Sequence, residues 1–348
     1  MANGSGIDYL LEVNAKHSRI FRDPSTSNMR GFYRRQHPTE IGVSKCMDGR
    51  LNLPYITETA LGIMSPWRNL GGKFDLGWIG YQQTIHEWVN YAIANRRQCL
   101  KLVTYHYSRG NKHRGCRGFN YNVEEARAFT LNLKRQFDEC FGTTVVHTVQ
   151  WGIETDLDAL VLHGEGGKVV DLADLQLESN PDLPDVLEDL YPAMPDEVRN
   201  DLLPLVEGNI RHIGSVRSSS RPIADVKHKE WVLAIGRGFD WLHELNTALI
   251  VGPFDPDLAA AITTAGQLLL DNVRAGRTNG RDIVLMASAP YRHRAGTPPR
   301  LAEQKARFLG KFAYDVLKRN VPKLVPSIRR LTGTVDMNTR EFGVLERS

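Results

Sequence analysis

Three residues with complementary chemistry stand close together in the segment KCMDGR at residues 45–50. Cys46 offers a thiolate, which is a soft metal ligand, while Asp48 offers an acid and Arg50 a permanent cation. Where a thiolate is joined by the imidazole nitrogen of a histidine elsewhere in the chain, the combination of ligands favours zinc. A catalytic zinc site takes three protein ligands and leaves the fourth position for water. The segment therefore predicts part of a zinc site.

Two further ligands are expected downstream of this segment. His106 ends the apolar run LKLVTYH, and Cys116 follows ten residues later. His113 is an alternative, because it forms a short His-x-x-Cys with Cys116, but it lies in the basic loop SRGNKHRG. We favour His106, because a strand end has a fixed position and sites assemble at the carboxyl ends of strands in α/β sheets. The predicted set is Cys46, His106 and Cys116, with one Zn²⁺ per chain.

Asp48 and Arg50 are expected to act as a pair. The aspartate would accept a hydrogen bond from zinc-bound hydroxide and so orient it. An unrestrained carboxylate two residues from Cys46 could instead ligate the metal and close the site. A bidentate arginine would hold the carboxylate away from the metal and keep it ionised.

The elements around these residues alternate between strands and helices. A strand before residue 46 is followed by a helix ending in arginines, a β-rich strand, a second helix and another strand, which predicts an α/β lobe with a mainly parallel sheet. Asn122 is expected to cap the second helix and Gly142 to follow its end. The segments are EIGVSKC, LGWIGYQQTIHEWVNYAIANRR, QCLKLVTYHYS, NVEEARAFTLNLKRQFDECFG and TTVVHTVQWGI.

The second half of the chain reads as a degenerate copy of the first. GRGFDWLHELNTAL aligns with GRLNLPYITETAL, and two later pairs of segments keep the same order. In this alignment Leu233 and Ile235 stand where Cys46 and Asp48 stand in the first copy. The chemistry is therefore expected in the first lobe alone. The predicted parts are a basic N-terminal arm at 1–40, a zinc-binding catalytic domain at 41–180, an acidic helical linker at 181–225 and a degenerate domain without a metal site at 226–348.

Composition argues against several other classes of protein. The 348 residues are 41% hydrophobic, and 44 basic against 40 acidic side chains give a net charge of +4, which is too mild to indicate nucleic acid. No apolar run approaches the roughly 18 residues of a membrane span, and the first residues show no signal peptide. Four cysteines are too few for a disulfide scaffold. We therefore expect a cytoplasmic protein.

The motif Cys-x-Asp-x-Arg at 46–50, followed by His106 and Cys116, resembles the β-carbonic anhydrases. WRNLGG at 67–72 is similar to their Arg-Asn-Ala-Gly segment. The long spacing from His106 to Cys116 resembles one branch, the carboxysome shell carbonic anhydrases. LKLVTYHYSRGNKHRGC, WGIETDLDALVLHG and HKEWVLAIGRGFDWLHELNT are similar to segments of that branch, over about residues 41–330. The chain departs from the branch by lacking its large N-terminal helical domain.

The resemblance implies a β-carbonic-anhydrase-like α/β fold, with a second lobe that has lost its metal site. It implies zinc at Cys46, His106 and Cys116, and an orienting pair of Asp48 and Arg50. His228 stands where that branch has a histidine near its active site, so it joins the candidate catalytic residues. The implied reaction is the reversible hydration of CO₂ to bicarbonate by zinc-bound hydroxide.

Alternatives and partners stay open at this point. A CS₂ or COS hydrolase would use the same scaffold, and a non-catalytic structural zinc site, closed by His113, would suit a shell-associated protein. The resemblance implies a homodimer or higher homo-oligomer, CO₂ and bicarbonate as ligands, and a location inside a carboxysome. Contact with a shell or with Rubisco would run through the N-terminal arm. No nucleic acid and no membrane are expected as partners.

Overall fold

The computed structural model describes residues 5–142, 144–175, 182–219, 226–242, 244–278, 281–292 and 298–348. It divides into two compact units. The first unit comprises Met29–Cys46 and Leu51–Lys227, and the second comprises Met1–Asn28, Met47–Arg50 and His228–Ser348. The chain therefore leaves the first unit for four residues directly after Cys46 and then returns to it.

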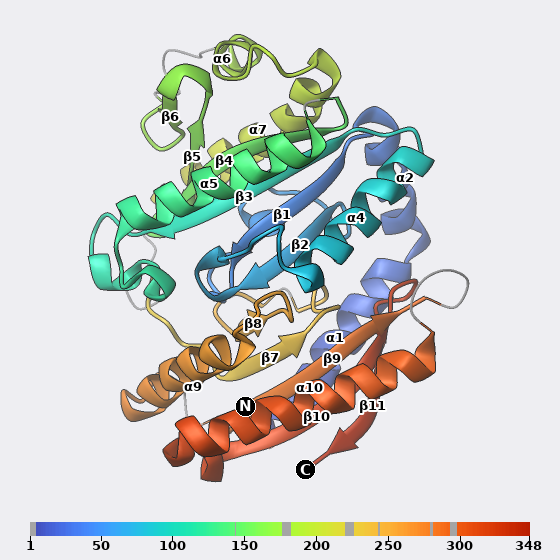
Figure 1. Ribbon diagram of the computed structural model, residues 1–348, viewed down its shortest axis with the longest axis vertical. Helices are drawn as coiled ribbons and strands as arrows, with labels where there is room; N and C mark the ends of the chain where they lie inside the picture. The colour runs from blue at the N-terminus through green and yellow to red at the C-terminus, as the bar shows by residue number, and fades with distance from the viewer. Residues whose placement is uncertain are drawn as a thin grey trace. The chain divides into compact units, whose positions relative to one another are not determined.

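A six-stranded sheet forms the centre of the first unit, in the order β2-β1-β3-β4-β5-β6 (Figure 1). The first four strands in this order run parallel, whereas β5 and β6 are antiparallel to their neighbours. The strands are β1 (Glu40–Cys46), β2 (Met64–Asn69), β3 (Cys99–Tyr107), β4 (Val146–Glu154), β5 (Ala159–His163) and β6 (Val169–Asp171).

The central strands are buried along almost their whole length. All residues of β1 and β4 are buried, and so are all but the last residue of β3. Strands that are covered on both faces need such continuous burial, which is why parallel sheets are found with helices around them. The predicted α/β class with a mainly parallel sheet flanked by helices is confirmed.

Helices complete the first unit. Residue Asn122 caps α5 by accepting a hydrogen bond from the Glu125 N–H (3.1 Å), and Gly142 ends the helix with φ of 63°, as the sequence predicts. Figure 1 shows α5 lying along β3 and β4. The first unit's helices are α3 (Leu53–Ile56), α4 (Ile79–Ala94), α5 (Val123–Phe141), α6 (Leu183–Leu190) and α7 (Asp196–Ser218), and α2 (Pro24–Gln36) begins in the second unit.

The second unit contains a five-stranded sheet in the order β11-β10-β9-β7-β8. Reversed, this order is β8-β7-β9-β10-β11, which matches β2-β1-β3-β4-β5 strand for strand. In both sheets only the last of these five strands is antiparallel to its neighbour. The strands are β7 (Val232–Gly236), β8 (Ala248–Val251), β9 (Ile283–Tyr291), β10 (Ile328–Asp336) and β11 (Phe342–Arg347). The second lobe is therefore a topological copy of the first.

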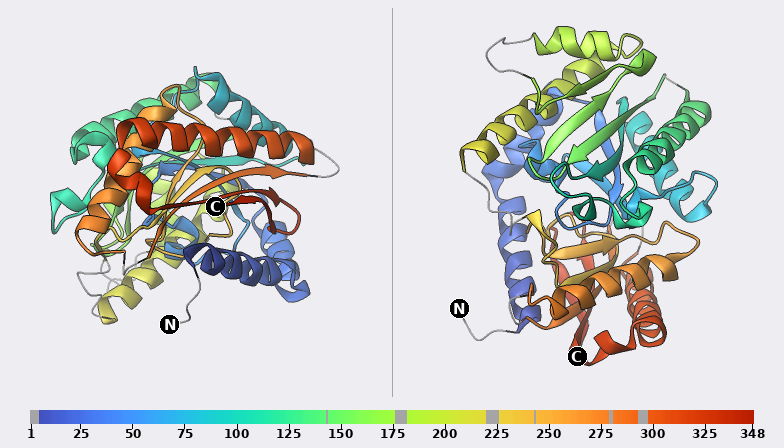
Figure 2. Two further views of the ribbon diagram at one scale, coloured as in Figure 1. Left: turned by 90° about the horizontal axis from the view of Figure 1, so that it is seen from below. Right: turned by 90° about the vertical axis from the view of Figure 1, so that its left-hand side faces the viewer.

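Both faces of the second sheet are covered by helices. On one face, α9 (Leu258–Arg274) and α10 (Pro299–Asn320) pack on the sheet. On the other face, α1 (Gly6–Arg22) contacts β9 and β11. Figure 2 shows α1 on the side of this sheet opposite α10. The N-terminal arm predicted at 1–40 contains the two helices α1 and α2. Ser5 and Asp8 form a capping box that starts α1, and Leu10 and Val13 are buried beneath it.

Candidate metal centre and the neighbouring Asp-Arg pair

The structure brings together Cys46, His106 and Cys116. Cys46 is the last residue of β1, and His106 lies near the end of the adjacent parallel strand β3, so both reach the same edge of the sheet. Cys116 immediately precedes a short 3₁₀ helix. One donor atom from each residue lies within 4.8 Å of the others, and all three residues are at most 5% exposed.

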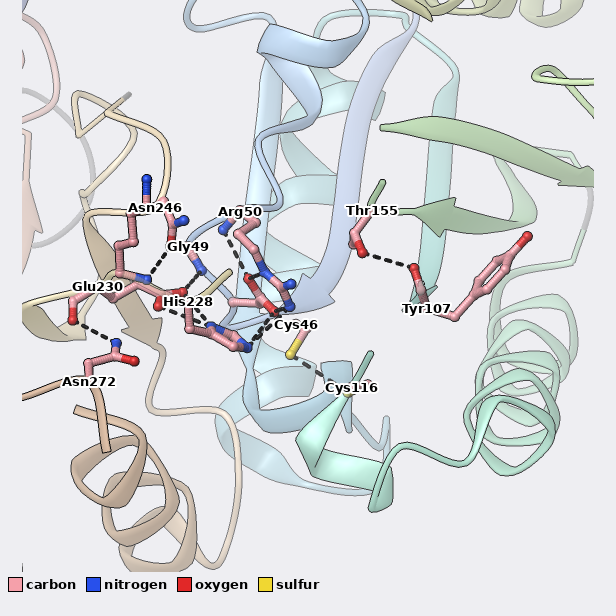
Figure 3. Close-up of polar contacts among 12 residues, drawn as sticks. Cys46, Gly49, Arg50, Tyr107, Cys116, Thr155, His228, Glu230, Asn246 and Asn272 are labelled. Carbon is pink, nitrogen blue, oxygen red and sulfur yellow. Dashed lines mark hydrogen bonds and ion pairs between the residues drawn. The ribbon is translucent and has the colours of Figure 1, made fainter. Parts of the chain in front are cut away.

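The donor set fits a zinc ion. The Sγ atoms of Cys46 and Cys116 are 3.9 Å apart (Figure 3). Two Zn–S bonds of about 2.3 Å at a tetrahedral angle place the sulfur atoms about 3.8 Å apart. Two thiolates and one imidazole also suit zinc better than magnesium or calcium, which prefer oxygen. Within the described residues the group has three members, the number that leaves a position for water at a catalytic zinc.

The other candidate histidine lies elsewhere. His113 is exposed, within a short 3₁₀ helix, and its ring packs edge-on against Tyr121 (centroids 5.2 Å apart). It does not belong to the Cys-His-Cys group. His113 is therefore an exposed residue of a basic loop, whereas His106 has the fixed position of a strand end.

The segment WRNLGG supports Cys46 from the neighbouring strand. Asn69 at the end of β2 is the register partner of Cys46, and the Arg68 Nε–H donates to the Cys46 carbonyl (3.4 Å). Gly72 has φ of 65°, and a Cβ there would come within 3.4 Å of the Cys46 backbone nitrogen. A glycine at this position therefore lets the turn pack directly on β1, the strand that ends at Cys46.

Acidic residues at the end of β4 organise the long loop between His106 and Cys116. Asp156 accepts hydrogen bonds from the Ser108 hydroxyl (2.9 Å) and the Gly110 N–H (2.7 Å), and it forms an ion pair with Arg114 (3.3 Å). Buried Glu154 accepts a hydrogen bond from the Arg109 N–H (3.0 Å).

A side-chain hydrogen bond extends this connection to β3. The Thr155 hydroxyl donates to the Tyr107 carbonyl (3.1 Å; Figure 3). Asp156 and Glu154 are not among the residues predicted from the sequence, because their partners lie in a loop more than 40 residues away along the chain.

Replacing Asp156 by alanine is expected to weaken metal binding. The loop that delivers Cys116 would lose three contacts at once. Supporting interactions of this kind typically change metal affinity about 10- to 100-fold. The rate of metal transfer to a chelator measures the effect. Asp138→Ala, which breaks a partly exposed ion pair with Lys134 on α5, is the control, and equal transfer rates in the two variants would contradict the role of Asp156.

Asp48 and Arg50 form a buried bidentate pair within the second unit. Nε of Arg50 lies 2.9 Å from Oδ1 of Asp48 and Nη2 lies 2.5 Å from Oδ2, while the Arg50 backbone N–H also donates to Oδ1 (2.9 Å). Both residues are 3% exposed. Three donors from one residue fix both the direction and the charge of the carboxylate.

His228 joins this pair, as Figure 3 shows. Its Nε2 atom lies 3.2 Å from Nη2 of Arg50, and its Nδ1 atom lies 3.0 Å from the carboxylate of Glu230. Asp48, His228 and Glu230 are close enough to suggest a second metal group. The Arg50 guanidinium, however, contacts both Asp48 and His228. The cation that these two side chains bind is therefore Arg50 and not a metal ion.

Glu230 is fully buried, with 0% exposure. Burial acts to raise its pKa, but the interactions with His228 outweigh burial and leave the pKa below the ordinary value. Glu230 is not among the residues predicted from the sequence. The alternation His-x-Glu at 228–230 was the available signal, because residues two apart in an extended segment project to the same side.

Comparison with known families agrees with this geometry. Within the described residues, no helix has the length and apolarity needed to cross a membrane. A comparison with curated proteins found no match. A family model described as "Carboxysome Shell Carbonic Anhydrase, catalytic domain" matches residues 28–172, which include Cys46, His106 and Cys116. Over residues 28–172 the chain is therefore similar to the catalytic domain of the carboxysome shell carbonic anhydrases.

Proposed function

We propose that the protein catalyses the reversible hydration of CO₂ to bicarbonate with one zinc ion per chain. The observation that carries this proposal is the buried Cys46–His106–Cys116 group inside the matched catalytic domain. When bound there, zinc supplies a water whose pKa falls to about 7, which provides a nucleophile at neutral pH.

The protein's own residues would orient the reaction. Asp48 follows Cys46 by two residues, and Arg50 holds its carboxylate in one direction. We propose that Asp48 accepts a hydrogen bond from the reacting water and thereby aims its lone pair at CO₂. Arg50 keeps Asp48 ionised, because an opposite charge at hydrogen-bond distance favours the charged form of a carboxyl group.

The cellular setting follows from the family. Because the matched family is that of a carboxysome shell enzyme, we propose a carboxysome as the setting and the shell as a partner. A homodimer or higher homo-oligomer stays a prediction.

Stopped-flow CO₂ hydration tests the function, with zinc measured on the same preparation. We expect rapid hydration with about one zinc per chain, and removal of zinc by a chelator should abolish it. Stoichiometric zinc without hydration would contradict the proposal. Assays with COS and CS₂ would then separate a hydrolase from a structural zinc protein.

A further inference from the structure

The four-residue segment Met47–Arg50 is held by the second unit through its backbone. The Ile250 N–H donates to the Met47 carbonyl (3.0 Å), and the Asn246 N–H donates to the Gly49 carbonyl (2.9 Å). The segment therefore lies along β8 and the residues before it, in the manner of a short added strand.

Glu230 supplies the third attachment of this segment. The Gly49 N–H donates to Oε1 of Glu230 at 3.1 Å (Figure 3). A Cβ atom at position 49 would lie 2.7 Å from the Ala248 carbonyl oxygen and 2.8 Å from Cγ of Glu230. No side chain fits there, so glycine allows the turn between Asp48 and Arg50 to lie flat against the carboxylate.

The contacts of His228 determine which of its ring nitrogens carries the proton. A guanidinium can only donate, so Nε2 of His228 must accept from Nη2 of Arg50. Nδ1 then carries the hydrogen and donates to Glu230, whose two oxygens both lie 3.0 Å away. The Asp48 carboxylate is 3.7 Å from Nε2, which is too long for a hydrogen bond.

We propose that Glu230 is a positioning residue that serves Asp48 and Arg50 through two routes. It fixes His228 as the Nδ1–H tautomer, so that Nε2 accepts from Arg50, and it fixes the backbone of Gly49 between the two members of the pair. All four cysteines lie in the first unit, so the second lobe has no thiolate ligands of its own. Its contribution to catalysis is to set the direction of the Asp48 carboxylate. This inference rests on the proposed function.

Glu230→Leu is the decisive variant. Leucine keeps much of the volume but leaves the Gly49 N–H and the Nδ1–H of His228 without their acceptor. We expect kcat to fall about 10- to 100-fold while zinc content stays at the wild-type level. Glu230→Gln keeps an amide oxygen that can still accept, so it should restore most of the lost kcat.

Asp201→Leu provides a matched control. Asp201 is buried in the first unit and also accepts from a histidine Nδ1, that of His37 (3.1 Å), and from a backbone N–H, that of Thr39 (2.8 Å). Neither donor contacts the Asp48–Arg50 pair. If kcat fell merely because a buried carboxylate was lost, it would fall in both leucine variants. A positioning role predicts a loss of kcat in Glu230→Leu alone.

A spectroscopic measurement tests the tautomer without reference to activity. In protein labelled with ¹⁵N-histidine, the signal of His228 is assigned by its loss in His228→Gln. We expect a protected Nδ1–H resonance in wild type, Glu230→Gln and Asp201→Leu, and its loss in Glu230→Leu.

The outcomes separate the inference from the proposed function. Wild-type protein that shows the Nδ1–H signal but no CO₂ hydration would overturn the function and keep the tautomer assignment. An Nε2–H tautomer in wild type would overturn the inference. So would a Glu230→Leu variant whose kcat stays within about twofold of wild type, or a Glu230→Gln variant as slow as Glu230→Leu.

Discussion

Replacing Cys46 by serine is expected to remove zinc and CO₂ hydration together. A serine hydroxyl stays protonated at neutral pH and is a poor ligand for zinc, whereas a thiolate is a good one. The remaining pair, His106 and Cys116, cannot hold the metal in a three-ligand geometry. Metal content and stopped-flow hydration, measured on the same sample, should both fall to background.

Cys99→Ala is the matched control for this experiment. Cys99 is a fully buried thiol on β3, and burial raises its pKa to about 12. It is not part of the metal group, so its replacement should leave zinc content unchanged. A Cys46→Ser variant that hydrates CO₂ without zinc would disprove the assigned site.

Replacing Asp48 by asparagine is expected to keep the metal and remove most of the activity. The amide lacks the negative charge, and its NH₂ group cannot accept from Arg50 or from the reacting water. Losses of about 10- to 100-fold or more in kcat are typical when a partner of this kind is removed. Full activity with zinc retained would show that the pair is only structural.

Stability provides the control for that experiment. Asp48→Asn leaves the buried Arg50 cation without its opposite charge, a change that typically costs about 3–5 kcal/mol of stability. The double variant Asp48→Asn/Arg50→Gln removes both charges and should be more stable than the single variant, yet equally inactive. Thermal unfolding compared with kcat in both proteins therefore separates a catalytic loss from an unfolding loss.

Much of the fold could be predicted because its signals are local. The strand that ends at Cys46 carries Ile41 and Val43, and the strand that ends near His106 is rich in aliphatic and aromatic residues. Helix α5 has its start and end marked by Asn122 and Gly142. Once these strands are neighbours in a parallel sheet, their carboxyl ends must meet. The proximity of Cys46 to His106 follows from that topology.

Two features that the sequence does not predict, strand β2 and the buried Lys101, lack such local signals. Strand β2 contains Pro66, and a proline within a run argues against a central strand; here β2 is at the edge of the sheet, where proline is tolerated. Lys101 on β3 is fully buried, with Nζ 4.0 Å from the ring centroid of Trp67. Burial lowers the pKa of this amine well below its ordinary value. No local pattern predicts a lysine enclosed by aromatic rings.

The supporting residues of the candidate site depend on contacts distant in sequence. Glu230 meets Gly49 across 181 positions, and Asp156 meets Ser108 across 48. Periodicity describes neighbours along one element and cannot report such pairs. The sequence therefore predicts the groups that do chemistry better than the groups that hold them.

Because Met47–Arg50 belongs to the second unit while the residues on both sides belong to the first, this protein cannot be divided simply into two expressed fragments. Because each unit is assembled from discontinuous stretches, no single cleavage of the polypeptide separates them intact. An expressed fragment covering 28–172 would contain the three candidate metal ligands and the Asp-Gly-Arg turn. It would lack Glu230, Asn246 and Ile250, the groups that hold that turn. Boundaries drawn from a family match alone would therefore yield a truncated product with Asp48 on an unsupported loop.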